Sequence, residues 1–365
     1  MQNEKLIYAA AVPFEAARQI AALPAGHRSR RLHGHGFLAT VWAQLPEGWA
    51  RFPGAEVDDL RTRLAAAVGP LDYRYLNECL EDPTDEHLAR WIRGRIDVPG
   101  LFKVGVRSTG REGVDLDPQA HAHVWRRYTL QAAHRLPNVR PGHKCGRMHG
   151  HGFAIVLHAD RNQDLRDPSL SAERLDESWA PIHAELDHAC LNDIAGLDNP
   201  TSEMLSAWIW RRLKPQLPQL SWVAVYETAN CGAHFDGAHY RIWKETSLDS
   251  ASRSSRAPGG DVRRRIHGHT YSLRLHLQAP LDQVLGWTVD FGDVSELFQP
   301  IFERLDHRPL HEIPGLADTD AASLVRWIRQ ECRNSLPQID RVDLFETRGC
   351  GAILQWGELG PALPL

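Results

Sequence analysis

A threefold repeat restricts the fold of this chain more than any other feature of its sequence. His-Gly-His occurs three times, beginning at His33, His149 and His267, with separations of 116 and 118 residues. An aspartate follows each first histidine after 39, 38 and 39 residues, at Asp72, Asp187 and Asp306. A Trp-Ile pair and then a strand-like segment follow in the same order in each copy. We therefore divide the chain into three modules of about 120 residues, a usual domain size, with boundaries at 1–120, 121–237 and 238–365.

The middle module indicates which elements one copy contains. Strand-forming residues dominate 128–134 and 151–160, helical spacing covers 173–187 and 201–213, and alternating segments lie at 221–228 and 232–237. This order predicts a β-β-α-α-β-β module of the α+β class. Four antiparallel strands leave two open edges, which pair readily with other strands. Three modules are therefore expected to close into a pseudo-trimeric, twelve-stranded antiparallel barrel with its helices outside.

The composition fits a soluble globular protein and disfavours two classes of partner. The 365 residues include 42 basic and 46 acidic side chains, a net charge of −4, so no cationic surplus is available for nucleic acid. No apolar run reaches the length of a membrane span, so no membrane partner is expected. Six cysteines are too few for a disulfide framework, which favours reduced thiols and a cytoplasmic location.

Three histidines of the middle module are candidate ligands of one metal ion. His149 and His151 lie two residues apart on a predicted strand, so their side chains share a face. His134 ends the preceding strand, and an antiparallel hairpin would place it beside His149. Three imidazoles with an open fourth position are typical of catalytic zinc. Because Arg18 and Ser252 replace His134 in the other modules, we expect about one Zn²⁺ per chain.

Cys145 lies four residues before His149 and has two possible roles. It is either a fourth zinc ligand or a thiol held next to substrate, and the spacing alone does not decide between them. Lys144 and Arg147, together with the ion, are expected to lower the pKa of the thiol from about 8.5.

Longer segments of the chain carry a family resemblance. The middle module contains AAHRLPNVRPGHKCGRMHGHGF at 132–153, ELDHACLND at 185–193, NPTSE at 199–203 and VYETANCGA at 225–233. These segments resemble the bacterial 6-carboxytetrahydropterin synthases of the 6-pyruvoyltetrahydropterin synthase family. The third module is similar at 286–307 and 344–352, whereas the first is weakly similar, with Tyr73 and Ser108 at family histidine and glutamate positions. The resemblance implies the tunnelling fold, with three single modules of the family here fused end to end.

The resemblance also implies roles for individual residues. His134, His149 and His151 would hold zinc, and Cys145 would abstract a proton. An Asp-His pair would be the partner acid/base, either Asp306-His307 from the third module or Asp187-His188 from the second. Substrate contacts are expected from Glu227, Glu346 and Thr201. We expect one working site per chain at the junction of modules two and three, with Asp306-His307 as its acid/base pair.

The activity implied is that of a zinc-dependent lyase that converts dihydroneopterin triphosphate to 6-carboxytetrahydropterin, as in queuosine or 7-deazapurine pathways. Two alternatives remain open: a zinc-containing pterin-binding scaffold without activity, and the same fold acting on a different pterin substrate or yielding a 6-pyruvoyl-type product. Because family barrels stack in pairs, a homodimer of stacked rings is expected as the assembly.

Overall fold

The computed structural model describes residues 4–161, 172–282 and 285–357. The first module contains β1 (Lys5–Arg18), β2 (His33–Ala43), α1 (Glu56–Val68), β3 (Arg74–Tyr75), α2 (Asp85–Arg93), β4 (Leu101–Thr109) and β5 (Glu112–Leu116). The second contains β6 (Ala122–His134), β7 (His149–Asp160), α3 (Ala172–Leu186), β8 (Ala189–Cys190), α4 (Ser202–Leu213), β9 (Leu220–Thr228) and β10 (Cys231–Phe235). The third contains β11 (Tyr240–Ser252), β12 (His267–Leu277), α5 (Phe291–Leu305), α6 (Ala321–Cys332), β13 (Ile339–Thr347) and β14 (Cys350–Gln355).

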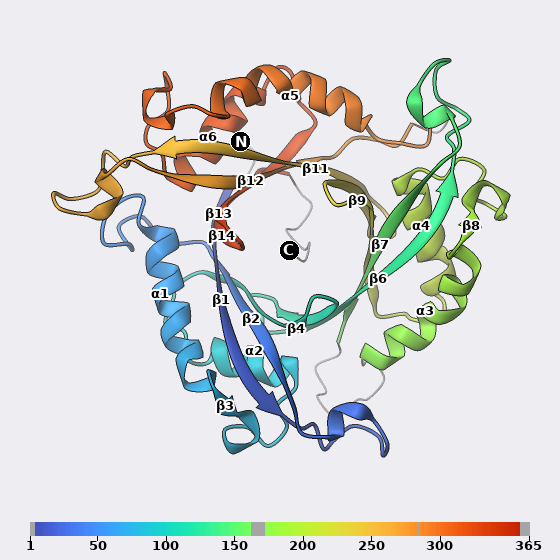
Figure 1. Ribbon diagram of the computed structural model, residues 1–365, viewed down its shortest axis with the longest axis horizontal. Coiled ribbons are helices and arrows are strands. Elements are labelled where there is room, and N and C mark those ends of the chain that lie inside the picture. The colour runs from blue at the N-terminus through green and yellow to red at the C-terminus, as the bar shows by residue number, and fades with distance from the viewer. Residues whose placement is uncertain (1–3, 162–171, 283–284, 358–365) are drawn as a thin grey trace.

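Within these described ranges, twelve strands form a closed antiparallel barrel to which each module contributes four neighbours (Figure 1). Their order around the ring is β14, β13, β12, β11, β10, β9, β7, β6, β5, β4, β2 and β1. The ring closes where β1 pairs with β14, from Lys5 opposite Gln355 to Ala9 opposite Gly351. The short strands β3 and β8 add parallel pairings to β1 and β6. The predicted α+β class and twelve-stranded pseudo-trimeric barrel are confirmed.

The helices cover the outside of the ring, so the two faces of the sheet differ (Figure 1). Leu60 of α1, Leu88 of α2 and Ile209 of α4 are fully buried in the core between helices and sheet. A separate apolar cluster, which includes Trp125, Trp222 and Trp243, lies on the other face, toward the barrel interior. Successive residues of a strand therefore point alternately to the helices and to the interior.

The β6–β7 hairpin positions the candidate metal ligands. Its register runs without a shift from His123 opposite Asp160 to His134 opposite His149. The helices that pack beside it begin and end within one residue of the predicted bounds. Thr201 accepts a hydrogen bond from the Met204 amide, which caps the start of α4.

Each module places one residue in the left-handed backbone region directly after the repeated aspartate. These residues are Tyr73, His188 and His307, with φ of 52°, 58° and 53°. The two Asp-His pairs thus lie directly after the ends of α3 and α5. A non-glycine residue in this region is uncommon, and such residues concentrate at functional sites.

None of the helices described is long and apolar enough to cross a membrane.

Candidate active site

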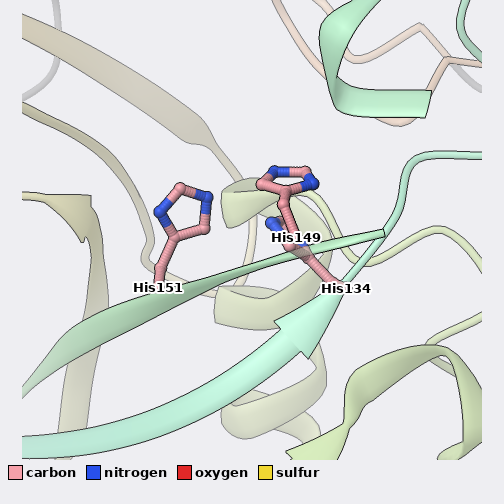
Figure 2. A group of neighbouring side chains, drawn as sticks. All are labelled: His134, His149 and His151. Carbon is pink, nitrogen blue, oxygen red and sulfur yellow. The ribbon is translucent and has the colours of Figure 1, made fainter. Parts of the chain in front are cut away.

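His134, His149 and His151 form a compact group at the end of the β6–β7 hairpin (Figure 2). One nitrogen from each ring lies within 4.8 Å of the others, and the ring centroids are 4.6 to 5.1 Å apart. His134 is fully buried, and the other two are partly exposed. The antiparallel pairing of His134 with His149 brings the three side chains together, as the sequence predicts.

The hydrogen bonds of this group fix the protonation of two rings. His134 Nδ1 donates to the Pro200 carbonyl at 2.9 Å, and His149 Nδ1 donates to the Arg147 carbonyl at 2.7 Å. In these two rings Nε2 therefore carries a lone pair, because a neutral imidazole carries only one N–H proton. The Nε2 atoms of His134 and His151 are buried without a hydrogen-bond partner. Burial lowers the pKa of both rings, so they are neutral ligands at pH 7. Three ring nitrogens this close together fit the ligand set of a bound Zn²⁺.

Glu227, near the end of β9, adjoins the histidine group. Its Oε1 lies 3.5 Å from His151 Nε2, and its Oε2 accepts a hydrogen bond of 2.7 Å from Ser202. A serine at the start of α4 thus holds the carboxylate in place beside the candidate metal.

Cys145 lies in a short 3₁₀ turn, Lys144–Gly146, where its amide donates to His143 Nδ1 at 3.2 Å. The surrounding protein groups raise the pKa of the thiol, whereas the lowering expected from Lys144, Arg147 and a bound ion together stays a prediction. Burial has the largest effect, followed by the negative charge of Glu227, and the opposing effect of Lys144 is smaller.

The third module closes one side of this site through the segment that precedes α5. His143 lies 3.3 Å from the Asp290 carboxylate and its ring is 6.1 Å from that of Trp287. Glu203 Oε1 accepts hydrogen bonds from the amide and hydroxyl of Thr288, at 2.9 and 3.3 Å. The candidate site therefore lies at the junction of modules two and three.

Thr201 links the same two modules. Its hydroxyl donates to the Gly286 carbonyl at 2.5 Å, and the side chain is 3% exposed. The contacts observed for this residue are thus structural, and its expected contact with a substrate stays a prediction.

The two Asp-His pairs occupy equivalent places in their own modules. Asp187 accepts a hydrogen bond from the Gln131 amide, and the His188 amide donates to the Gln131 carbonyl, on the strand that ends at His134. Asp306 and His307 make the same two bonds to Asp249 of β11. Each histidine also bonds to its aspartate, at 2.9 Å for His188 and 2.7 Å for His307. Both imidazoles are more than three-quarters exposed. Among the described residues of module three, those of 285–290 contact the segments of module two around the three histidines. Asp306 and His307 make no such contact that the structure gives.

Other side chains occupy the ligand positions in the first and third modules. The Arg18 guanidinium bonds to the Pro83 carbonyl at 3.0 Å and to Asp85 at 2.7 Å, where His134 bonds to Pro200 in module two. Ser252 donates instead to Thr319. At the cysteine position, Arg263 binds Asp58 of the first module at 2.6 Å.

Glu346 differs from Glu227 in its electrostatic surroundings. Burial, followed by the charges of Asp58 and Asp320, raises the pKa of Glu346 to about 8. This shift favours the protonated carboxyl group at neutral pH, and the expected substrate contact of Glu346 stays a prediction.

Sequence reasoning missed the residues that join the modules around the site, namely His143, Glu203, Trp287 and Asp290. The segment with Trp287 and Asp290 lies within the family-like stretch 286–307, which offered one signal. The local pattern contains nothing that pairs these residues across modules.

Comparison with known proteins gives a family for all three modules. The profile described as 6-pyruvoyl tetrahydropterin synthase matches residues 8–107, 123–238 and 241–356. A protein of Synechocystis sp. named 6-carboxy-5,6,7,8-tetrahydropterin synthase is 33% identical over 119 residues, which are 31% of this chain and 91% of that protein. A dihydroneopterin monophosphate aldolase of Pyrococcus furiosus is 30% identical over 94 residues, 25% of this chain and 79% of that protein.

Among solved structures, 6-pyruvoyl tetrahydropterin synthase of Caenorhabditis elegans aligns over 32% of this chain and 95% of its own, with 20% identity and a TM-score of 0.29. Since the family profile matches three times and covers most of the sequence, the chain belongs to the 6-pyruvoyl tetrahydropterin synthase family.

Proposed function

We propose that this chain is a zinc-dependent lyase that converts dihydroneopterin triphosphate to 6-carboxytetrahydropterin, in a queuosine or other 7-deazapurine pathway. One observation carries the proposal: one nitrogen from each of His134, His149 and His151 lies within 4.8 Å of the others, and Glu227 lies 3.5 Å from His151 Nε2. The relative named 6-carboxy-5,6,7,8-tetrahydropterin synthase supports the choice of product.

His134, His149 and His151 would hold the ion, and about one Zn²⁺ per chain would serve this site. When bound, zinc supplies a Lewis acid that polarises side-chain oxygens of the pterin and acidifies the neighbouring C–H. Pro200 and Arg147 orient two of the rings through their carbonyl groups, which strengthens the rings as ligands.

Cys145 is the proposed base for that C–H. A partly buried thiol with a raised pKa holds its proton until a nearby positive charge stabilises the thiolate. Coupling between thiolate formation and site occupancy would protect the cysteine from reaction when the site is empty.

Glu227 is the proposed anchor for the pterin ring. A carboxylate can accept two parallel hydrogen bonds from the amino group and ring N–H of a planar heterocycle. The Ser202 hydroxyl fixes one oxygen of Glu227. The protonation of Glu346 at neutral pH makes the third module a poorer site for the same contact.

We choose the Asp-His pair that completes the site by the strand to which each pair is hydrogen-bonded. Asp187 and His188 bond to β6, which also carries His134, whereas Asp306 and His307 bond to β11 of another module. These contacts favour Asp187-His188 over the junction assignment that the sequence suggested. In either pair a hydrogen bond to the aspartate orients the imidazole.

The direct test is turnover of dihydroneopterin triphosphate with the product mass as readout. The wild type is expected to form 6-carboxytetrahydropterin, and Cys145→Ala is expected to lose at least about 100-fold in rate, the usual contribution of a general base. Cys79→Ala, which alters a cysteine of the first module, is the matched control and should keep full activity. Failure of the zinc-loaded wild type to turn over this substrate would contradict the proposal.

Two specific observations support alternative functions. Since two modules lack the ligand set, a pterin-binding scaffold without activity is an alternative; it predicts pterin binding by wild type with no product. The aldolase relative indicates that similar modules act on other pterins, so dihydroneopterin monophosphate and a 6-pyruvoyl-type product belong in the same assay.

A barrel already closed by one chain needs no further copies around the ring, so stacking of two rings is the assembly we propose.

A further inference from the structure

A second group of metal-ligand side chains lies at the other end of the β6–β7 hairpin. We name His123, His158 and Asp160 the mouth cluster; one ligand atom from each lies within 4.8 Å of the others. His123 is directly opposite Asp160 in the register, and His158 precedes Asp160 by two residues. All three side chains therefore point to one face of the hairpin.

The mouth cluster is separate from the candidate active site. Eleven residues along β6 separate His123 from His134, a distance of roughly 35 Å in an extended strand. Because this number is odd, the two groups lie on opposite faces of the sheet. The face of the mouth cluster continues into Trp125 and Val156 of the interior apolar cluster, so it faces the barrel interior.

His158 is held with one nitrogen ready for an ion. Ser221 donates its proton to the His158 carbonyl at 3.0 Å, so its oxygen accepts from His158 Nδ1 at 2.6 Å. That bond places the ring proton on Nδ1 and the lone pair on Nε2. The ring stacks on Trp222 with centroids 4.4 Å apart and is 5% exposed. Burial lowers the pKa of His158 to about 3, which keeps the ring neutral.

The other two members lie next to this ring. His123 stacks on His158 with centroids 5.3 Å apart, and its Nδ1 is 2.6 Å from Asp160 Oδ1. Asp117 lies 3.6 Å from the Nε2 of His123, on the opposite edge of the ring. A carboxylate behind a metal-bound imidazole is a frequent outer partner, because it orients the ring and strengthens its lone pair.

Comparison of the modules shows that this arrangement is particular to the second. The repeat offsets place Ile7, Trp42 and Gln44 at these positions in module one, and Arg241, His276 and Gln278 in module three. His276 is committed to the buried Asp343 carboxylate at 3.1 Å. A simple His123-Asp160 ion pair needs no third ligand-type side chain within 4.8 Å, whereas a metal site does.

We propose that the mouth cluster binds one divalent transition-metal cation, of the Zn²⁺, Co²⁺ or Ni²⁺ class, through two imidazoles and one carboxylate. Two nitrogens and a carboxylate oxygen are a ligand set that suits these borderline ions. Ligand atoms around one tetrahedral ion lie about 3.4 Å apart, so small side-chain rotations from the present 4.8 Å limit suffice. The proton that His123 and Asp160 share would leave as the ion enters.

An entry path to the cluster exists from solvent. The Asp160 side chain is 56% exposed and lines a cavity of about 790 Å³, together with Trp210, Lys214, Ser221 and Asp236. An ion bound here would keep a fourth position for water or an oxygen ligand from that cavity.

The test counts metal rather than activity, and the His149→Ala background separates the mouth cluster from the zinc site of the proposed function. The chelator-stripped full chain is titrated with Co²⁺, and bound metal is followed by visible absorption and elemental analysis. The wild type is expected to bind two ions per chain and His149→Ala one. In the His149→Ala background, Asp160→Asn should weaken the remaining ion at least tenfold.

Two variants complete the design. His158→Gln in the His149→Ala background should bind no tightly held ion, and Asp160→Asn, whose side chain is exposed, covers the case in which the buried His158 variant does not fold. His239→Gln, which alters an exposed histidine at the start of the third module, is the control and should keep two ions. No bound ion in His149→Ala at saturation, or unchanged affinity when Asp160→Asn is added to that background, would overturn the proposal.

Discussion

At the scale of single residues, the three modules place different side chains at one equivalent position. In module one, the Arg18 guanidinium occupies the position that His134 has in module two. Asp85 forms an ion pair with this guanidinium. Ser108 then donates to Asp85 at the position where Glu227 accepts from Ser202. The loss of metal ligands is thus accompanied by a buried ion pair that satisfies the same polar surroundings.

Glu203 gives a pH-dependent prediction at this scale. Burial raises the pKa of Glu203 to about 7, so the folded protein binds its proton more tightly than the unfolded chain does. This stabilisation is complete below about pH 4.5 and is lost as the pH rises through 7, a change on the order of 3 kcal/mol.

Glu203→Gln should remove most of that dependence, since an amide oxygen can still accept from Thr288. Urea unfolding at pH 5.5 and pH 8.5 measures the difference for each protein. An equal fall in stability in wild type and Glu203→Gln would contradict the assignment; Glu177→Gln, on the exposed surface of α3, is the control.

Single substitutions can also distinguish the two Asp-His pairs. His188→Ala should lower turnover by about 100-fold, as expected for loss of a proton-transfer group, whereas His307→Ala should retain activity. Both imidazoles are exposed, so neither change is expected to unfold the chain. Loss of activity only in His307→Ala would restore the junction assignment.

At the scale of elements, the barrel depends on close contacts between neighbouring strands. Gly351 lies opposite Ala9 at the closing pair β1–β14 and opposite Phe345 of β13. A Cβ at this position would lie 2.0 Å from the Leu344 carbonyl oxygen. Backbone atoms on both sides leave no flexible group to move aside.

Gly351→Ala should therefore destabilise the protein by about 2 kcal/mol, as overpacking of a closed site does. The free energy of unfolding in urea is the measurement. Gly259→Ala, where a Cβ meets nothing within 4 Å, is the matched control and should change little. Unchanged stability of Gly351→Ala would show that the closing strand pair can shift.

At the scale of the whole molecule, the barrel interior contains a buried charged group that replaces apolar packing in the third module. Arg341 donates to both oxygens of Asp343 at 2.6 Å, and His276 lies 3.1 Å from the same carboxylate. All three side chains are fully buried. The adjacent charges lower the pKa of Asp343 strongly despite its burial.

Asp343→Asn should cost about 3–5 kcal/mol, because it leaves the Arg341 charge buried without its counter-ion. Thermal and urea unfolding of the full chain would measure the loss. Glu331→Gln, which breaks the exposed pair with Arg304, should cost less than about 1 kcal/mol. A cost for Asp343→Asn as small as that of the control would contradict the assigned burial.

The sequence by itself determined the repeated features, because they follow from local periodicity. The spacing of His149 and His151, the hairpin partner His134 and the bounds of α3 and α4 need only strand and helix geometry. Only the tertiary structure decided what depends on burial and on contacts between modules. The contact of Asp290 with His143, the protonation of Glu346 and the grouping of His158 with His123 arise where distant segments exclude water together. No local pattern in a sequence encodes the desolvation or the long-range proximity that fixes these properties.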